Sequence, residues 1–210
     1  MLKCVYAGLA AAMLFAGGAA AAQSRPAPPP SIADALAQTV QRVAAAAPGG
    51  GWTIVRAAFP NARWNPHERF NPPLSDGQTD LLTGHAMLGG IRHGINAHGA
   101  ARGPASIEFD AGLPHRVDLA ALRRAMTARG LDVTLLGCDN GYAAWSYRSE
   151  GAPSAYLRIA GRGGDIFFQL SRTADPTRTA QAGRYTSYAI FFALPLTRAQ
   201  ADALDPRHCG

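Results

Sequence analysis

The sequence predicts an α+β fold: an antiparallel sheet of about five to seven strands, helices packed on one face of the sheet, and one disulfide bond. Three observations favour this class. Residues 131–194 contain five runs with the composition of strands, separated by turn residues. Helical patterns flank these runs, and two cysteines in the second half of the chain are available to pair.

The five runs define the predicted sheet. A period of two places alternate side chains on opposite faces of a pleated strand, so one face can be buried while the other stays wetter. The runs cover residues 131–135, 143–147, 155–159, 166–170 and 185–194. The pair Asn140-Gly141 predicts a tight hairpin between the first two runs. The last run is apolar at both parities and is therefore expected to be the most buried strand.

The first 22 residues have the layout of a secretory signal peptide. Residues 1–3 form a short positive start, residues 5–15 are apolar and uncharged, and residues 16–22 are small with an A-x-A cleavage site near Ala22. The alternative is an uncleaved membrane anchor, but this segment is rich in Ala and Gly and would insert weakly. We therefore expect a periplasmic or secreted protein, and no later stretch is long and apolar enough to span a bilayer.

Arginine alone makes the mature chain basic. The single lysine is Lys3, so residues 23–210 contain 19 arginines against 14 acidic residues, a net charge of +5. Such a charge favours anionic partners, for example phosphate or cell-envelope polymers. The simpler explanation is codon bias in a GC-rich genome, which favours Arg over Lys together with Ala, Gly and Pro. The arginines are spread along the chain instead of clustered, which favours this explanation and speaks against nucleic acid as a partner.

Two cysteines, Cys138 and Cys209, remain after processing. An even number in an exported chain predicts a disulfide. It would close a loop of about 70 residues. On the chain-entropy model, closing such a loop stabilises the folded state by roughly 4 kcal/mol. The alternatives are a metal-ligand pair and a redox pair, but the sequence has no C-x-x-C motif.

Residues 23–30 form a Pro-rich linker, and residues 31–47 are predicted to form a helix. Ser31 with Asp34 three residues later has the pattern of a capping box. Apolar residues then recur at helical spacing on one narrow stripe, and Pro48 with the following glycines ends the helix. Two interpretations stay open: the stripe packs on the domain, or it docks on a partner.

Residues 52–59 are predicted to form a strand, and residues 60–103 an irregular stretch rich in Gly and Pro. Within that stretch, a helix capped by Ser75 or Asp76 is expected to run to about Leu88. The five glycines that follow predict a loop, and a loop of this length inside a compact domain is often functional.

The remaining elements complete a single domain over residues 31–210. A short strand is expected at residues 107–109, followed by a helix that Asp118 caps and Gly130 ends. After the sheet, Thr197 is expected to cap a final helical turn. This order of elements, without an internal repeat, is typical of α+β proteins.

The largest group of residues that could form a metal or catalytic site consists of three histidines, His85, His93 and His98. His67 and His115 lie on either side of this group in the sequence. Histidine is a common metal ligand and titrates near neutral pH. A helical metal site needs histidines four residues apart, and none of these pairs has that spacing. A metal site in a loop is the alternative interpretation, although His85 lies on the apolar side of its predicted helix and is more simply a core residue.

No catalytic motif accompanies the histidines. The sequence lacks G-x-S-x-G, H-E-x-x-H and a phosphate-binding loop, and nothing in it predicts a cofactor. The alternative enzyme is an envelope hydrolase or nuclease in which His93 and His98 transfer protons and Arg92 holds a phosphate.

The most specific binding hypothesis concerns the face of the predicted sheet opposite to the apolar side chains. At the parity opposite to the apolar residues, neighbouring strands would bring together Arg148, Tyr156, Arg158, Phe167 and Gln169. Such a patch can stack on a ring or hold an anion or a carboxylate. The alternative is a solvated face with arginine stems lying over the rings. The sequence thus predicts an exported binding or accessory protein, not an enzyme, that holds an anionic ligand or a protein partner of the cell envelope.

Overall fold

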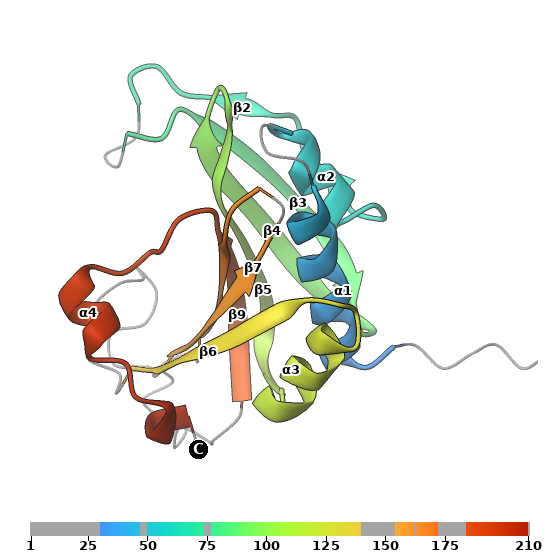
Figure 1. Ribbon diagram of the computed structural model, residues 1–210. Helices are drawn as coiled ribbons and strands as arrows, with labels where there is room; N and C mark the ends of the chain where they lie inside the picture. Colours follow the sequence, from blue (N-terminus) through green and yellow to red (C-terminus); the bar gives the residue numbers. More distant parts are fainter. Residues whose placement is uncertain are drawn as a thin grey trace, which may run out of the picture.

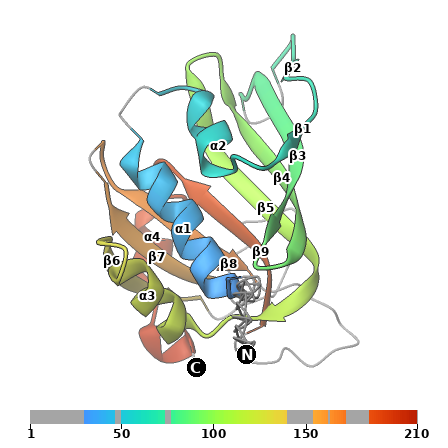
Figure 2. The same cartoon turned by 90° about the vertical axis from the view of Figure 1, so that its right-hand side faces the viewer.

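The computed structural model describes residues 30–46, 50–73, 77–139, 154–161, 163–171 and 184–209. In this part of the chain, one antiparallel sheet carries helices on one face (Figure 1; Figure 2). Its strands are β1 (Arg63–Trp64), β2 (Glu68–Arg69), β3 (Asp80–Leu88), β4 (Ile91–Ala100), β5 (Gly103–Arg116), β6 (Asp132–Cys138), β7 (Ser154–Ala160), β8 (Ile166–Ser171) and β9 (Arg184–Phe191). The helices are α1 (Ile32–Ala45), α2 (Thr53–Ala58), α3 (Leu119–Thr127), α4 (Arg198–Asp202) and the 3-10 turn η1 (Pro206–Cys209).

The predicted α+β class is confirmed, but the sheet is larger than predicted. Its strand order is β1-β3-β4-β5-β9-β8-β7-β6, with β2 also paired to β3, which makes nine strands among the described residues instead of five to seven. The additional strands come mainly from residues 60–103, which the sequence predicts to be irregular. That prediction is wrong, because β3, β4 and β5 form a continuous meander there.

Glycines in the turns explain why the sequence pattern does not predict the three strands of this meander. Gly89 and Gly90 have φ angles of 57° and 79°, which suit the tight turn between β3 and β4. At the other end of β4, a Cβ on Gly99 would lie 2.3 Å from the carbonyl oxygen of Gly103, so only glycine fits. These residues predict a loop when taken singly, whereas in the sheet they allow close hairpins.

Two further element predictions are also wrong. The helix expected to run to Leu88 is strand β3, in which Leu82, Ala86 and Leu88 are buried at a period of two. The strand expected at residues 52–59 is helix α2, in which Val55 and Ala58 are buried at helical spacing. Both segments are short and apolar, and tertiary packing decides between helix and strand in such runs.

Helices α1, α2 and α3 lie on the same face of the sheet, which we call the inner face (Figure 2). Leu36, Val40 and Val43 of α1 are buried in the hydrophobic core, so its apolar stripe packs on the domain. Gln41 Nε2 also donates a 2.9 Å hydrogen bond to the carbonyl oxygen of Arg129, just after α3. The interpretation of α1 as an arm for a partner therefore does not apply to this stripe.

The helix caps form as predicted. Ser31 Oγ accepts a hydrogen bond from the Asp34 N–H, and Asp118 accepts one from the Ala121 N–H at the start of α3. Thr197 opens α4 with a complete capping box. After α3, Gly130 adopts a φ of 77°, the left-handed conformation that ends helices.

Strands β6 to β9 follow the alternation in the sequence. The run at residues 143–147 lies outside the described residues, and the other four runs form β6, β7, β8 and β9. Strand β9 lies between β5 and β8, and it buries both Tyr188 and Ile190 of one parity and Tyr185 and Ala189 of the other. Both parities thus contain buried residues, as predicted, but the strand ends at Phe191, which is partly exposed, and Leu194 of the predicted run is 39% exposed beyond it.

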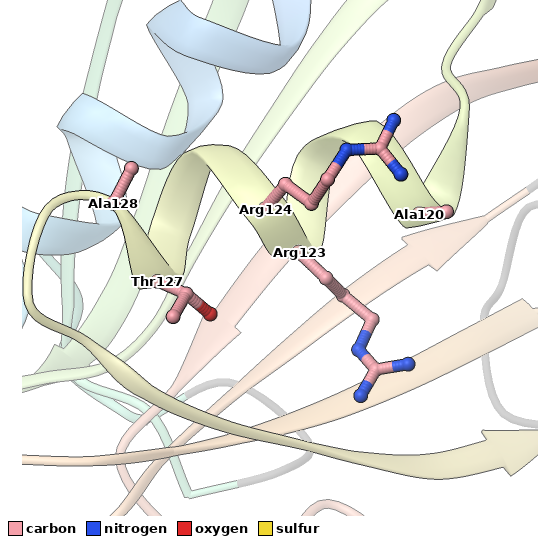
Figure 3. A pocket seen from close by; sticks show the side chains of 5 residues that line it. All are labelled: Ala120, Arg123, Arg124, Thr127 and Ala128. Carbon is pink, nitrogen blue, oxygen red and sulfur yellow. The ribbon is translucent and has the colours of Figure 1, made fainter.

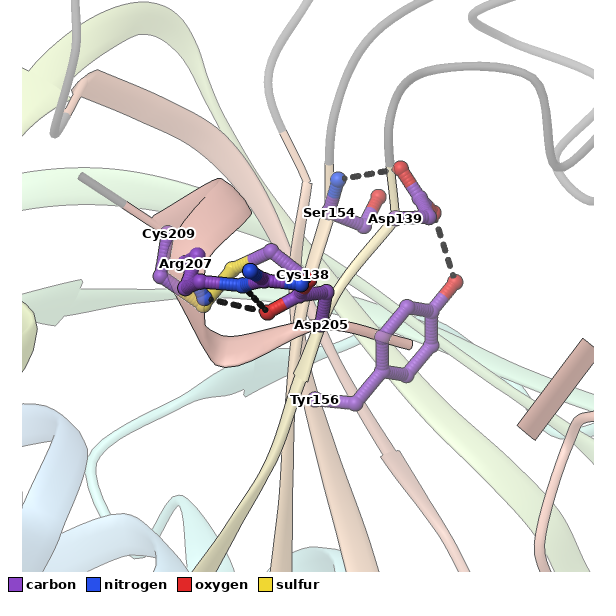
Figure 4. Close-up of a disulfide and its surroundings, with 7 residues drawn as sticks. All are labelled: Cys138, Asp139, Ser154, Tyr156, Asp205, Arg207 and Cys209. Carbon is purple, nitrogen blue, oxygen red and sulfur yellow. Dashed lines mark hydrogen bonds and ion pairs between the residues drawn. A yellow bond between two sulfur atoms is a disulfide. The ribbon is translucent and has the colours of Figure 1, made fainter. Parts of the chain in front are cut away.

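The predicted disulfide is confirmed. Cys138 at the end of β6 bonds to Cys209 in η1, with a Cα–Cα distance of 5.1 Å (Figure 4). The backbone of Cys138 also exchanges two hydrogen bonds with Asp205. The C-terminal segment is thereby fastened to the β6 edge of the sheet. Across the described ranges, the search for a helix with the length and hydropathy of a membrane span finds none.

Candidate functional site

Strands β7 and β8 place four of the five predicted binding residues on one face of the sheet. The register pairs Arg158 with Phe167 and Tyr156 with Gln169. Their neighbours in each strand have the opposite parity and point into the core, so these four side chains lie on the side away from α1, α2 and α3. We call this side the outer face. The fifth residue, Arg148, lies outside the described residues.

Two of the four side chains, Tyr156 and Gln169, belong to a hydrogen-bond network, and Figure 4 shows its part around Tyr156, Asp139 and Ser154. The Tyr156 hydroxyl lies 3.3 Å from Asp139 Oδ2, and Gln169 Nε2 donates to the Tyr156 oxygen at 3.1 Å. The Ser154 N–H donates to Asp139 Oδ1 at 2.9 Å. Tyr156 is 2% exposed, and its burial, with the charge of Asp139, raises the pKa of its hydroxyl. Tyr156 therefore stabilises the sheet instead of offering its ring to a ligand.

Arg158 is exposed, but a carboxylate neutralises it. Its Nε lies 2.6 Å from Asp165 Oδ2, and the two side chains are 49% and 35% exposed. A surface pair of this kind contributes only about 0–1 kcal/mol to stability. Its more important effect is electrostatic, because it places a guanidinium and a carboxylate side by side at the surface.

Phe191 extends this surface onto β9. The register places Phe191 opposite Phe167, which lies opposite Arg158. Both phenylalanines are partly exposed. The sequence did not single out Phe191, because its run is apolar at both parities and only the β8–β9 register shows which residues face outward. We call Arg158, Asp165, Phe167 and Phe191 the aromatic patch.

His93, a candidate in both the metal and the enzyme interpretations, is a core residue. Its side chain is fully buried on the inner face, and its Nδ1 lies 3.0 Å from the carbonyl oxygen of Ile91. Its ring packs near Phe109 and Tyr188, with ring centroids 6.3 and 5.9 Å away. A substrate or metal ion at the surface does not reach this side chain.

His85 and His98, the other two histidines of the predicted group, lie on the opposite face from His93, and His85 is partly exposed there instead of in the core. The alternation of β4 places Arg92 and His98 on the outer face, and the β3–β4 register places His85 there too, opposite Gly94. The structure thus separates His93 from both of its predicted catalytic partners, Arg92 and His98. Within the described ranges, no three His, Cys, Asp or Glu side chains are grouped so that they could hold a metal ion.

A shallow groove of about 440 Å³ follows the exposed side of α3 (Figure 3). Its lining residues are Ala120, Arg123, Arg124, Thr127 and Ala128. Figure 3 shows that the two guanidinium groups point in different directions. They therefore do not converge on one small anion, and the groove is a weaker candidate than the aromatic patch.

Comparison with protein-family models, curated proteins and solved structures gives no significant match for this chain. Its function must therefore be inferred from the geometry of its own residues. Among the surfaces described above, the aromatic patch combines partly exposed rings with a fixed register on three adjacent strands.

Proposed function

We propose that this chain is an exported binding or accessory protein that holds a protein partner of the cell envelope on its aromatic patch. The observation that carries the proposal is the row of Arg158, Phe167 and Phe191 on three neighbouring strands. Aromatic residues and arginine are enriched at the energetic centres of protein interfaces. The patch presents two partly exposed phenylalanine rings beside one ion pair, so it suits the mixed apolar and polar surface of a protein better than a small anion.

Two features support export. The first 22 residues have the pattern of a cleavable signal peptide. The bond between Cys138 and Cys209 is typical of proteins in an oxidising compartment such as the periplasm. Together they favour a partner that is exposed in the cell envelope.

The hydrolase or nuclease alternative has less support. It requires His93 beside His98 and Arg92, and these side chains lie on opposite faces of β4. A binding role needs only an exposed surface with a rigid scaffold, which β7, β8 and β9 supply.

The proposal is tested by capture from envelope extract on the immobilised mature protein. One defined partner is expected, and Phe167→Ala should weaken its binding about 30-fold, as for an interface residue worth about 2 kcal/mol. Met87→Ala is the matched control, because Met87 is 62% exposed on the outer face of β3, away from the patch.

Both variants should keep the thermal midpoint of the wild type to within a few degrees, since neither side chain is fully buried. If the double variant Phe167→Ala, Phe191→Ala captures the same partner with unchanged affinity, the patch is not the binding site. If no partner is captured by the wild type, the binding role itself is contradicted.

A further inference from the structure

A second cluster of polar side chains lies at the other end of the sheet, where β2 pairs with β3. The register places Arg69 directly opposite Asp80, so the two side chains share one face. Pro66 precedes His67 between β1 and β2, where neither residue is part of a strand. His67 is therefore not constrained by strand pairing, and its ring contacts the carboxylate of Asp80.

Asp80 is the centre of this cluster. Its side chain is 1% exposed, and its Oδ1 lies 3.3 Å from both His67 Nε2 and Arg69 Nε. The Thr79 hydroxyl donates to Oδ2 at 2.7 Å. Thr79 and, to a lesser degree, Arg69 and His67 hold the pKa of the Asp80 carboxyl below its usual value, against the opposing effect of burial. Both oxygens of a buried carboxylate are thus used to hold neighbouring side chains.

The two basic side chains face outward from that carboxylate. The Arg69 side chain is 71% exposed, although its Nε contacts Asp80, so its terminal nitrogens are accessible to solvent. The His67 side chain is 33% exposed. The guanidinium and the imidazole are therefore anchored at one nitrogen each to the same oxygen, and the remaining parts of both groups reach the surface.

Trp52 fixes the imidazole from a second direction. Its ring centroid lies 4.6 Å from that of His67, with a tilt of 56° between the planes. The Trp52 indole N–H donates a 3.0 Å hydrogen bond to the carbonyl oxygen of Ala100, which holds the indole against the end of β4. His67 is thus oriented by a carboxylate at its Nε2 and by the aromatic ring of Trp52.

We propose that His67 and Arg69 form a binding site for a small oxyanion group, such as a phosphate or a carboxylate, and that Asp80 and Trp52 are its positioning residues. A planar guanidinium with free terminal nitrogens matches the geometry of such anions. A site whose donors are already held in place loses little side-chain entropy on binding. The negative charge of Asp80 opposes the anion, so we expect a Kd on the order of millimolar for the isolated ion.

A purely structural role would account for the burial of Asp80 but makes a different prediction. If Asp80 only fastens residues 65–70 onto β3, as the hydrogen bond from the Phe70 N–H to the Thr79 carbonyl also does, anions should not respond to Arg69. If the cluster is a site, anion binding depends on Arg69 even in variants with unchanged stability. The experiment below uses this difference.

The test is a titration of the folded mature protein with inorganic phosphate, followed by NMR of the histidine imidazole signals at constant pH and ionic strength. His67→Gln identifies the His67 signal among the six histidines of the chain. We expect a saturable shift of that signal, weakened at least 10-fold in Arg69→Gln and unchanged in Arg63→Gln. Arg63 is the matched control because it is an exposed arginine on β1, opposite His85 and outside the cluster.

A parallel titration with acetate distinguishes a phosphate site from a carboxylate site, because the tighter of the two ions identifies the preferred group. Arg69→Lys keeps the charge and is expected to retain weakened binding, which provides a second variant if Arg69→Gln is poorly folded. A linear, unsaturated response to both ions in the wild type, or equal affinities in the wild type and Arg69→Gln, would overturn the proposal.

Discussion

The two edges of the sheet hold their neighbouring segments by different physical means. At the β6 edge, a covalent bond between Cys138 and Cys209 fastens the C-terminal segment. At the opposite edge, formed by β1 and β2, the buried carboxylate of Asp80 on β3 holds residues of β2 and the segment before it. The first connection depends on the redox state and the second on protonation. The ionic connection also leaves exposed nitrogens that can bind a ligand, whereas the sulfur bridge does not.

The largest expected effect comes from breaking the covalent connection. Cys138→Ala with Cys209→Ala should reduce the free energy of unfolding by about 4 kcal/mol, because the unfolded chain regains the freedom of a loop closed across 71 residues. Urea denaturation of the wild type with and without reductant measures the same quantity. If the wild type shows two free thiols and its stability does not respond to reductant, the disulfide and the argument for export are contradicted.

Breaking the ionic connection should have a smaller effect. Asp80→Asn removes a buried charge that holds Arg69 and His67, and we expect a loss of about 1–3 kcal/mol in the free energy of unfolding. Denaturation with urea under oxidising and reducing conditions gives the measurement. The loss should be the same in both conditions, because the two connections lie at opposite edges of the sheet.

The two connections should also respond differently to acid. The folded-state pKa of Asp80 is lowered from its usual value of 3.8. The stabilisation it supplies is therefore fully present above about pH 4 and is lost as the pH falls through the folded pKa. Stability curves between pH 6 and pH 2 should fall less steeply for Asp80→Asn than for the wild type. Equal slopes would mean that the carboxylate does not stabilise the fold through its charge.

The smallest expected effect concerns the ion pair beside the disulfide. Arg207 holds the pKa of Asp205 at about 2 through hydrogen bonds, but the Arg207 side chain is 89% exposed (Figure 4). Solvent screens such a pair, so Arg207→Gln should leave the thermal midpoint nearly unchanged while the disulfide is intact. A large shift would show that Arg207 is needed to position η1 for the bond to Cys138.

Sequence patterns predicted the second half of the sheet much better than the first. In β7 and β8, large apolar residues alternate with polar ones, so Leu157 and Phe168 could be assigned to the core and Arg158 to the opposite face. In β3 and β4, glycine and histidine take many of the alternating positions, and the pattern disappears. His93 shows the reason, because it is a polar residue type at a position that the fold buries completely. The apolar alternation of β4 is therefore interrupted at a core position.

The candidate sites show the same limit. Parity alone predicted that Arg158 and Phe167 share a face, and the β7–β8 register confirms their pairing. The neutralisation of Arg158 by Asp165 depends on how the chain turns between the strands, which no spacing in the sequence indicates. The cluster around Asp80 was missed, because the pairing of β2 with β3 is needed to bring His67 to it.

By itself, the sequence determined the local features of this protein. The caps at Ser31, Asp118 and Thr197, the strand alternation after residue 131 and the pairing of Cys138 with Cys209 all followed from nearest neighbours or from elimination. The tertiary structure alone decided whether the short apolar and glycine-rich runs before residue 104 became helix or strand. The physical reason is that a strand obtains its hydrogen bonds from another segment, so its identity depends on a partner that local sequence does not contain.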